Sequence, residues 1–261
     1  RRDPPRCVHM TPNPRYIQIK LRHIHRFHFG QSPDSIEKRV MFLQAHPGYG
    51  MVRSNGDFFD YETGGRIGPL SHAENRFRED IFLDLILEET FCACGCYMIR
   101  TDCLRRVYPE LRIYETGVGQ NWQILIPIAG REKCGYIDEE LYHIAVRADS
   151  HSRHMRTLEE EVQRRMGLKQ VLEQGIALSG RRDRDYQTIV DIKYRRILFW
   201  TYLKYGDKEK AMECYRELTR EGAVRGTERN LYLQHFHPAR YRLRILAARA
   251  MGKAKRMMLK T

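Results

Sequence analysis

The fold is decided by residues 138–153, which read Asp138-Glu-Glu-Leu-Tyr-His-Ile-Ala-Val-Arg-Ala-Asp-Ser-His-Ser-Arg153. Residues 141–147, which read Leu141-Tyr-His-Ile-Ala-Val-Arg147, predict a strand. Residues 134–138 predict another strand directly before it. The polar residues that follow predict a loop leaving the end of the second strand.

Upstream segments alternate between helical and extended patterns. A helix is predicted from residue 33, with Asp34 or Ser35 as its N-cap, to residues 46–48. A strand that starts at residue 49 is expected to end in a turn at Asn55 and Gly56. Further helices are predicted at residues 73–89, 102–107 and 122–129, and a strand at residues 91–99. The alternation predicts an α/β domain with a mixed sheet and flanking helices.

After residue 153 the pattern is helical to the end of the chain. Helices are predicted at residues 186–205 and 208–221, with Asp207 as the cap of the second. The last predicted helix, residues 238–260, carries an apolar stripe among arginines and lysines. Such a helix can bind an anionic membrane surface, and the alternative is a core-docked helix with a solvated basic face.

The composition fits a globular protein, since hydrophobic residues make up 42% of 261 residues. The apolar run at residues 124–129 is far too short to span a bilayer, and no signal peptide is recognised. Seven cysteines are an odd number without a regular framework, which indicates free thiols in a reducing, cytoplasmic compartment. Cys92, Cys94 and Cys96 would share one face of a strand, as buried thiols rather than a zinc site.

The net charge of +13 is concentrated at the two ends of the chain. No acidic residue follows Glu228, so the C-terminal region is strongly basic. This distribution favours phosphate-rich partners such as an anionic membrane surface or a diphosphate-linked lipid. A nucleic-acid-binding protein is the alternative from another class, but no nucleic-acid motif accompanies the charge. A non-catalytic interaction module is a further alternative.

Three segments, residues 95–100, 119–123 and 138–153, resemble the acceptor half of a family 2 nucleotide-sugar glycosyltransferase of the GT-A (Rossmann-like) fold. The resemblance covers residues 33–155, and residues 156–261 form an α-helical C-terminal extension that matches more loosely. It implies transfer of a sugar from a nucleotide-sugar donor to a saccharide or lipid-linked acceptor in bacterial cell-surface polysaccharide synthesis. The implied location is cytoplasmic, with possible peripheral attachment to the inner face of the membrane.

Residues 1–32 do not match the nucleotide-binding half of that family and form a basic, irregular leader with one possible short strand. The family holds Mg²⁺ or Mn²⁺ with an Asp-x-Asp pair, because hard cations prefer carboxylate oxygens. That pair is missing ahead of residue 33, where the chain reads Phe27-His-Phe-Gly-Gln-Ser32. The leader could be a non-native reading frame or a natural basic extension, and we expect the chain as given to lack the donor site and to be inactive.

The resemblance also assigns candidate site residues. Glu115 is the nearest carboxylate that could deprotonate an acceptor hydroxyl, and an exposed-loop role is its alternative. The loop after residue 146 suits a diphosphate, because Arg forms bidentate charge-assisted bonds and His151 can also ligate a metal. A polar loop that caps the next helix is the alternative reading. The donor-diphosphate candidates are Arg147, Ser150, His151 and Ser152, and the acceptor candidates are Arg53, Asn55, Gln120, Asn121 and Trp122.

Overall fold

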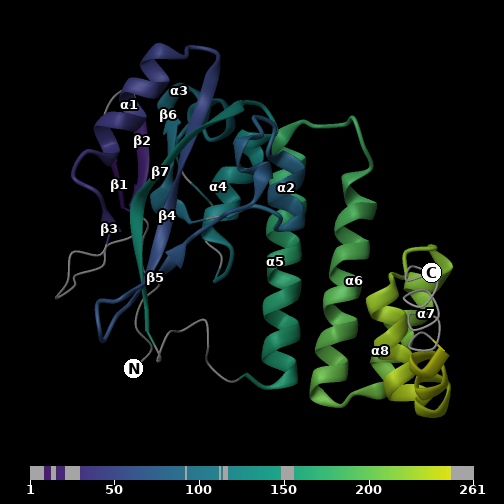
Figure 1. The fold of residues 1–261 in the computed structure, drawn as a ribbon. Coiled ribbons are helices and arrows are strands. Elements are labelled where there is room, and N and C mark those ends of the chain that lie inside the picture. The colour runs from purple at the N-terminus through teal and green to yellow at the C-terminus, as the bar shows by residue number, and fades with distance from the viewer. Residues whose placement is uncertain are drawn as a thin grey trace, which may run out of the picture. The chain divides into compact units, whose positions relative to one another are not determined.

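The computed structural model describes residues 9–12, 16–20, 30–91, 93–111, 113, 117–147 and 156–247. The chain divides into two compact units, Arg1–Val190 and Asp191–Thr261. The first unit is α/β, with a mixed sheet, and the second is helical (Figure 1). The first unit includes the helix at residues 158–179, which the sequence analysis groups with the C-terminal extension.

Within the described residues, one sheet of seven strands has the order β1-β2-β6-β4-β7-β3, and β5 pairs with β4. The long central strands β4 and β7 are parallel to each other, and every other pair is antiparallel. Three strands come from residues 1–32, where we expected one short strand in an irregular leader. The strands are β1 (His9–Pro12), β2 (Tyr16–Lys20), β3 (Gly30–Gln31), β4 (Tyr49–Asp60), β5 (Arg66–Pro69), β6 (Tyr97–Arg100) and β7 (Lys133–Val146).

Helices cover both faces of the sheet, as the alternation along β4 requires. Val52 packs with Leu43 of α1 and Met98 of β6 in one buried cluster. Arg53, the next residue on β4, faces the other way and reaches the segment ahead of α2. The helices of the first unit are α1 (Ser35–Ala45), α2 (Phe82–Leu87), α3 (Thr101–Val107), α4 (Gln120–Ala129) and α5 (Leu158–Ser179), with 3-10 turns at Glu74–Phe77 and Cys94–Cys96.

The predicted helices at residues 33–46, 102–107 and 122–129 are confirmed as α1, α3 and α4. Asp34 is the N-cap residue of α1, although its side chain accepts no bond from the first turn. α4 is buried along almost its whole length and packs against α5, where Gly175 leaves room for Ile126.

Three local predictions are wrong. The expected turn at Asn55 and Gly56 is absent, because β4 runs straight through it in the buried centre of the sheet. The two strands predicted at residues 134–138 and 141–147 form the single strand β7. The helix expected at residues 73–89 is interrupted, because Glu74–Phe77 form a 3-10 turn and the α-helix begins only at Phe82. The carbonyl oxygens of Asn75 and Arg76 also accept hydrogen bonds from Arg53.

The predicted cysteine-bearing strand is also wrong in part, because residues 94–96 form a 3-10 turn before β6. Cys96 is buried as expected, while Cys92 and the Cys94 side chain lie outside the described residues. Cys103 and Cys134 are buried free thiols as well. Burial raises the pKa of each of these two thiols to about 12, so both are protonated at neutral pH.

The second unit contains most of α6 (Tyr186–Tyr205), together with α7 (Lys208–Arg220) and α8 (Gly226–Phe236). The helix predicted at residues 186–205 is confirmed, and Asp207 caps α7 by accepting a hydrogen bond from the Lys210 N–H. Tyr215 and Tyr232 stack with ring centroids 3.9 Å apart and join α7 to α8. Helical backbone continues from residue 238 to residue 247. In the described part of the chain, no helix is long and apolar enough to cross a membrane.

Candidate functional site

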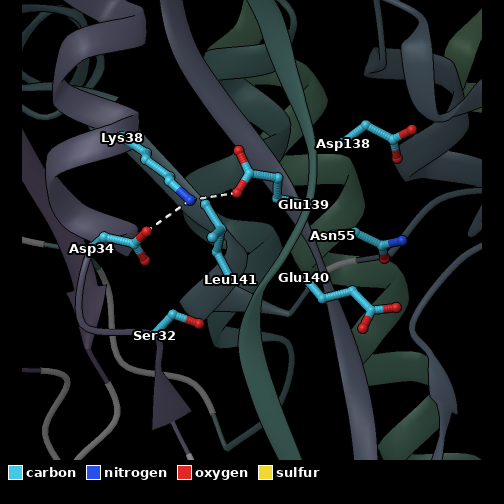
Figure 2. A pocket seen from close by; sticks show the side chains of 8 residues that line it. All are labelled: Ser32, Asp34, Lys38, Asn55, Asp138, Glu139, Glu140 and Leu141. Carbon is cyan, nitrogen blue, oxygen red and sulfur yellow. Dashed lines mark hydrogen bonds and ion pairs between the residues drawn. The ribbon is translucent and has the colours of Figure 1, made fainter.

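A cavity of about 530 Å³ opens where α1 begins beside the middle of β7 (Figure 2). Seven of its eight lining residues are polar, so the cavity is suited to a ligand with many hydroxyl or charged groups. They come from the segment before α1, from α1 itself, from β4 and from β7. The lining residues are Ser32, Asp34, Lys38, Asn55, Asp138, Glu139, Glu140 and Leu141.

The acidic wall of the cavity is a bulge in β7. Ser54 of β4 is opposite Ile137, but the next residue, Asn55, is opposite Glu140. Asp138 and Glu139 are therefore two additional residues on β7 that have no partner position on β4. A bulge of this kind turns side chains out of the regular alternation. All three carboxylates are among the lining residues, with Glu139 directed toward Lys38 of α1 and Asp138 and Glu140 directed to the other side of β7 (Figure 2).

Each cavity carboxylate has a cation as a neighbour. Lys38 lies between Asp34, at 2.7 Å, and Glu139 (Figure 2). The hydrogen bond from Lys38 holds the pKa of Asp34 below its usual value, and the Asp34 carboxylate raises the pKa of Lys38. Arg66 pairs with Glu140, and Arg76 pairs with Asp138 at a longer distance of 3.3 Å. The wall is thus polar and hydrogen-bonding without a large net charge.

A second arrangement, which we call the Ser-His-Asp chain, joins Ser32, His143 and Asp57. Ser32 Oγ is 3.1 Å from His143 Nε2, and His143 Nδ1 is 2.6 Å from Asp57 Oδ1. Asp57 is almost fully buried, with 4% of its side chain exposed, and Arg66 Nε lies 3.2 Å from its other carboxylate oxygen. Ser32 also lines the cavity, so the chain of hydrogen bonds ends at the cavity wall.

Strand pairing puts these three side chains together. His143 of β7 is opposite Asp57 on its parallel neighbour β4 and opposite Gly30 on its antiparallel neighbour β3. Ser32 follows β3 directly, and its N–H donates to the Leu141 carbonyl of β7. The backbone of all three residues is therefore fixed by adjacent strands.

The acceptor candidates Arg53 and Asn55 have protein partners. The fully buried Arg53 guanidinium donates to the Arg76 carbonyl at 2.7 Å and to Thr90 Oγ1 at 2.5 Å, and lies over the Phe91 ring. Asn55 lines the cavity, but its side-chain nitrogen donates to the Ser71 carbonyl at 2.9 Å. Of the two, the structure brings only Asn55 to the cavity.

Gln120, Asn121 and Trp122 form the first turn of α4, away from the residues that line the cavity. Trp122 is buried, whereas Gln120 is exposed. Arg147, just after β7, stacks its guanidinium over the Tyr61 ring at 4.0 Å. The remaining candidates, Glu115, Ser150, His151 and Ser152, lie outside the described residues.

Sequence reasoning missed the Ser-His-Asp chain. In the sequence, His143 is a single polar residue within a predicted strand, and Asp57 directly follows the turn predicted at Asn55 and Gly56. Neither position therefore indicates a functional group. The signal that could have found Asp57 is a carboxylate flanked by Gly56 and Phe58 within a buried strand, since such a group needs a partner.

The resemblance implies a divalent metal, so we examined whether the described residues fit one. They contain no group of three or more His, Cys, Asp or Glu side chains placed to hold an ion. The cavity carboxylates do not fit such a site either, because one oxygen of each already pairs with the cation of Lys38, Arg66 or Arg76. The metal candidate His151 lies outside the described part of the chain.

No protein-family model matches the chain, and no curated protein matches it either.

Proposed function

We propose that the first unit is the acceptor-binding part of a sugar transferase, which uses a nucleotide-sugar donor and a saccharide or lipid-linked acceptor. The observation that supports the proposal is the polar cavity, whose wall of paired carboxylates and the Ser32 hydroxyl suits the hydroxyl groups of a saccharide. The mixed sheet with the parallel pair β4 and β7 is compatible with the GT-A-like half that the sequence resembles.

The transfer would form a bond between an acceptor oxygen and the anomeric carbon of the donor. The bond from that carbon to the diphosphate breaks, the nucleoside diphosphate leaves, and the acceptor hydroxyl loses its proton to a base. Among the cavity carboxylates, Asp138 is the best placed base. Its side chain is half exposed, and its ion pair with Arg76 is longer than those of Asp34 and Glu140.

The test is saccharide binding, because this step requires no nucleotide-sugar donor. Saturation-transfer NMR with a panel of neutral oligosaccharides should show binding to the wild-type chain. Asp138→Asn combined with Glu139→Gln should weaken it at least about tenfold, since hydrogen bonds to charged groups contribute about 1.5–3 kcal/mol each.

The matched control is Glu209→Gln combined with Glu213→Gln on the solvent-exposed side of α7, which should leave binding unchanged. If no oligosaccharide of the panel binds, or if the cavity variant binds as well as the control, the cavity is not an acceptor site.

Peripheral attachment to a membrane is supported by the helical residues 238–247. Leu243 and Leu246 are 66% and 60% exposed, and exposed arginines surround them. We expect the chain to pellet with phosphatidylglycerol-containing vesicles at low salt and Leu243→Ser/Leu246→Ser to lose most of this binding. Ile67→Ser, at a position that is 60% exposed on β5, is the control. Equal pelleting of the double variant and the wild type would contradict the attachment.

A further inference from the structure

We propose that Ser32, His143 and Asp57 act as nucleophile, general base and orienting acid, and that they give this chain an acyl-transfer activity toward small carboxylic esters. The proposal concerns a different reaction from sugar transfer and does not depend on a sugar donor. Its basis is the Ser-His-Asp chain of hydrogen bonds, which has the connectivity that activates a serine hydroxyl in unrelated folds.

The hydrogen-bonding partners select the tautomer of the neutral His143 ring. An ionised Asp57 carboxylate can only accept, so the His143 Nδ1 atom carries a hydrogen and donates it across 2.6 Å. In the neutral ring, Nε2 then has a lone pair, and Ser32 Oγ–H donates to it across 3.1 Å. This is the tautomer that a general base for a serine hydroxyl needs.

The surroundings hold the ring and the acid in place. Phe59 meets the His143 ring edge-on, with centroids 5.6 Å apart. Arg66 Nε, 3.2 Å from Asp57 Oδ2, balances the charge of the buried acid. Since Asp57 has only 4% of its side chain exposed, water cannot compete freely for its bond to His143.

The serine is equally well positioned. Gln31, directly before it, accepts hydrogen bonds from Arg39 at 2.9 Å and from Ser35 Oγ at 2.7 Å, and it donates to the Gly95 carbonyl at 2.8 Å. Arg39 is fully buried, and burial lowers the pKa of its guanidinium to about 10. The end of β3 is thus held by α1 and by the 3-10 turn at Cys94–Cys96, which preorganises the Ser32 hydroxyl.

The cavity gives Ser32 access to a substrate, and the start of α1 supplies electrostatic support. The side chain of Asp34, the N-cap residue, accepts no hydrogen bond from a backbone N–H of the first turn of this helix. The N–H groups of Ile36 and Glu37 in that turn therefore keep their capacity to donate, and the helix dipole favours negative charge there. Ser32 is three positions ahead of Ser35, the first residue of α1. An oxyanion that forms next to Ser32 would therefore lie near the N-terminus of α1.

The step balances without any co-reactant except water. Ser32 Oγ attacks the ester carbonyl carbon while its proton moves to His143 Nε2. Collapse of the tetrahedral intermediate breaks the carbon–oxygen bond to the alcohol, which leaves with that proton. Water then attacks the acyl-Ser32 carbonyl with His143 again as the base, and this releases the carboxylic acid and restores the serine.

The test uses a fluorophosphonate probe, which forms an Oγ–P bond and releases fluoride. Incubation of the full chain should label the tryptic peptide of residues 27–38, and fragment ions should place the label on Ser32 and not on Ser35. Ser32→Ala should abolish labelling, and His143→Ala should slow it at least about 100-fold, as expected for loss of a general base. Ser71→Ala and His72→Ala, on a neighbouring segment outside the chain of hydrogen bonds, are the matched controls.

Asp57→Asn can disturb the buried ion pair with Arg66, so a second measurement keeps the proposal testable. In Ser32→Cys the new thiol should react with iodoacetamide faster than an unfolded cysteine, and His143→Ala should remove this acceleration while circular dichroism stays unchanged. Labelling that survives His143→Ala, a label on another residue, or no label at all would overturn the proposal. None of these outcomes depends on saccharide binding, so failure here is distinguishable from failure of the sugar-transferase proposal.

Discussion

Gly56→Ala is expected to lower the free energy of unfolding by about 3 kcal/mol, at or beyond the upper end of ordinary overpacking effects. A Cβ atom on Gly56 would lie 2.4 Å from the backbone carbonyl oxygen of Tyr142, across the parallel pair of β4 and β7. A backbone carbonyl in the centre of a sheet cannot move aside as a flexible side chain can. The strands would have to separate next to Asp57 and His143.

Urea denaturation followed by circular dichroism measures this change. Gly48→Ala is the matched control, because a Cβ atom there meets nothing within 4 Å, and its free energy of unfolding should stay within about 0.5 kcal/mol of the wild type. We also expect Gly56→Ala to reduce fluorophosphonate labelling of Ser32, since His143 pairs with β4 just beyond the clash. A variant as stable as Gly48→Ala would show that the two strands are not this close.

Arg53→Met is expected to lower the free energy of unfolding by about 3 kcal/mol, through hydrogen bonds that methionine cannot make. Methionine fills much of the volume of the arginine side chain. The decrease in the free energy of unfolding therefore comes from lost polar contacts and not from a new cavity. The Arg76 carbonyl and the Thr90 hydroxyl would lose their donor, and both lie in the segments that flank α2. The contact with the Phe91 ring would be lost as well.

The control is Arg105→Met, which removes the same charge from an exposed position on α3 and should change stability by less than about 0.5 kcal/mol. The same pair of variants separates a structural role for Arg53 from acceptor binding. Unchanged stability of Arg53→Met together with lost saccharide binding would favour the acceptor role that the sequence resemblance implies.

Elements with local signals could be predicted from the sequence. α4 has a continuous apolar run, and α7 begins after Asp207, whose side chain caps it. The α/β class follows from the alternation of helical and extended segments along the first unit. These features depend on residues within a few positions of one another, and sequence patterns report such neighbours well.

Features that depend on distant partners could not be predicted. Asn55 and Gly56 are residues typical of a turn. In the structure, the backbone of β7 passes so close to Gly56 that a side chain there would prevent the two strands from pairing. The Ser-His-Asp chain joins residues separated by 111 and 86 positions along the sequence. Its existence depends on the strand order β4-β7-β3, which no local pattern encodes.

Because of the bulge in β7, two residues that line the cavity take no part in the pairing of β7 with β4. Ser54 pairs with Ile137 and Asn55 with Glu140, so the intervening Asp138 and Glu139 sit outside the register that holds β4 and β7 together. Because these two positions have no partner on β4, we expect substitutions there to leave the pairs on either side of them in place. Specificity can therefore diversify within the strand itself, in the way that surface loops permit in other folds, at little expense to the scaffold.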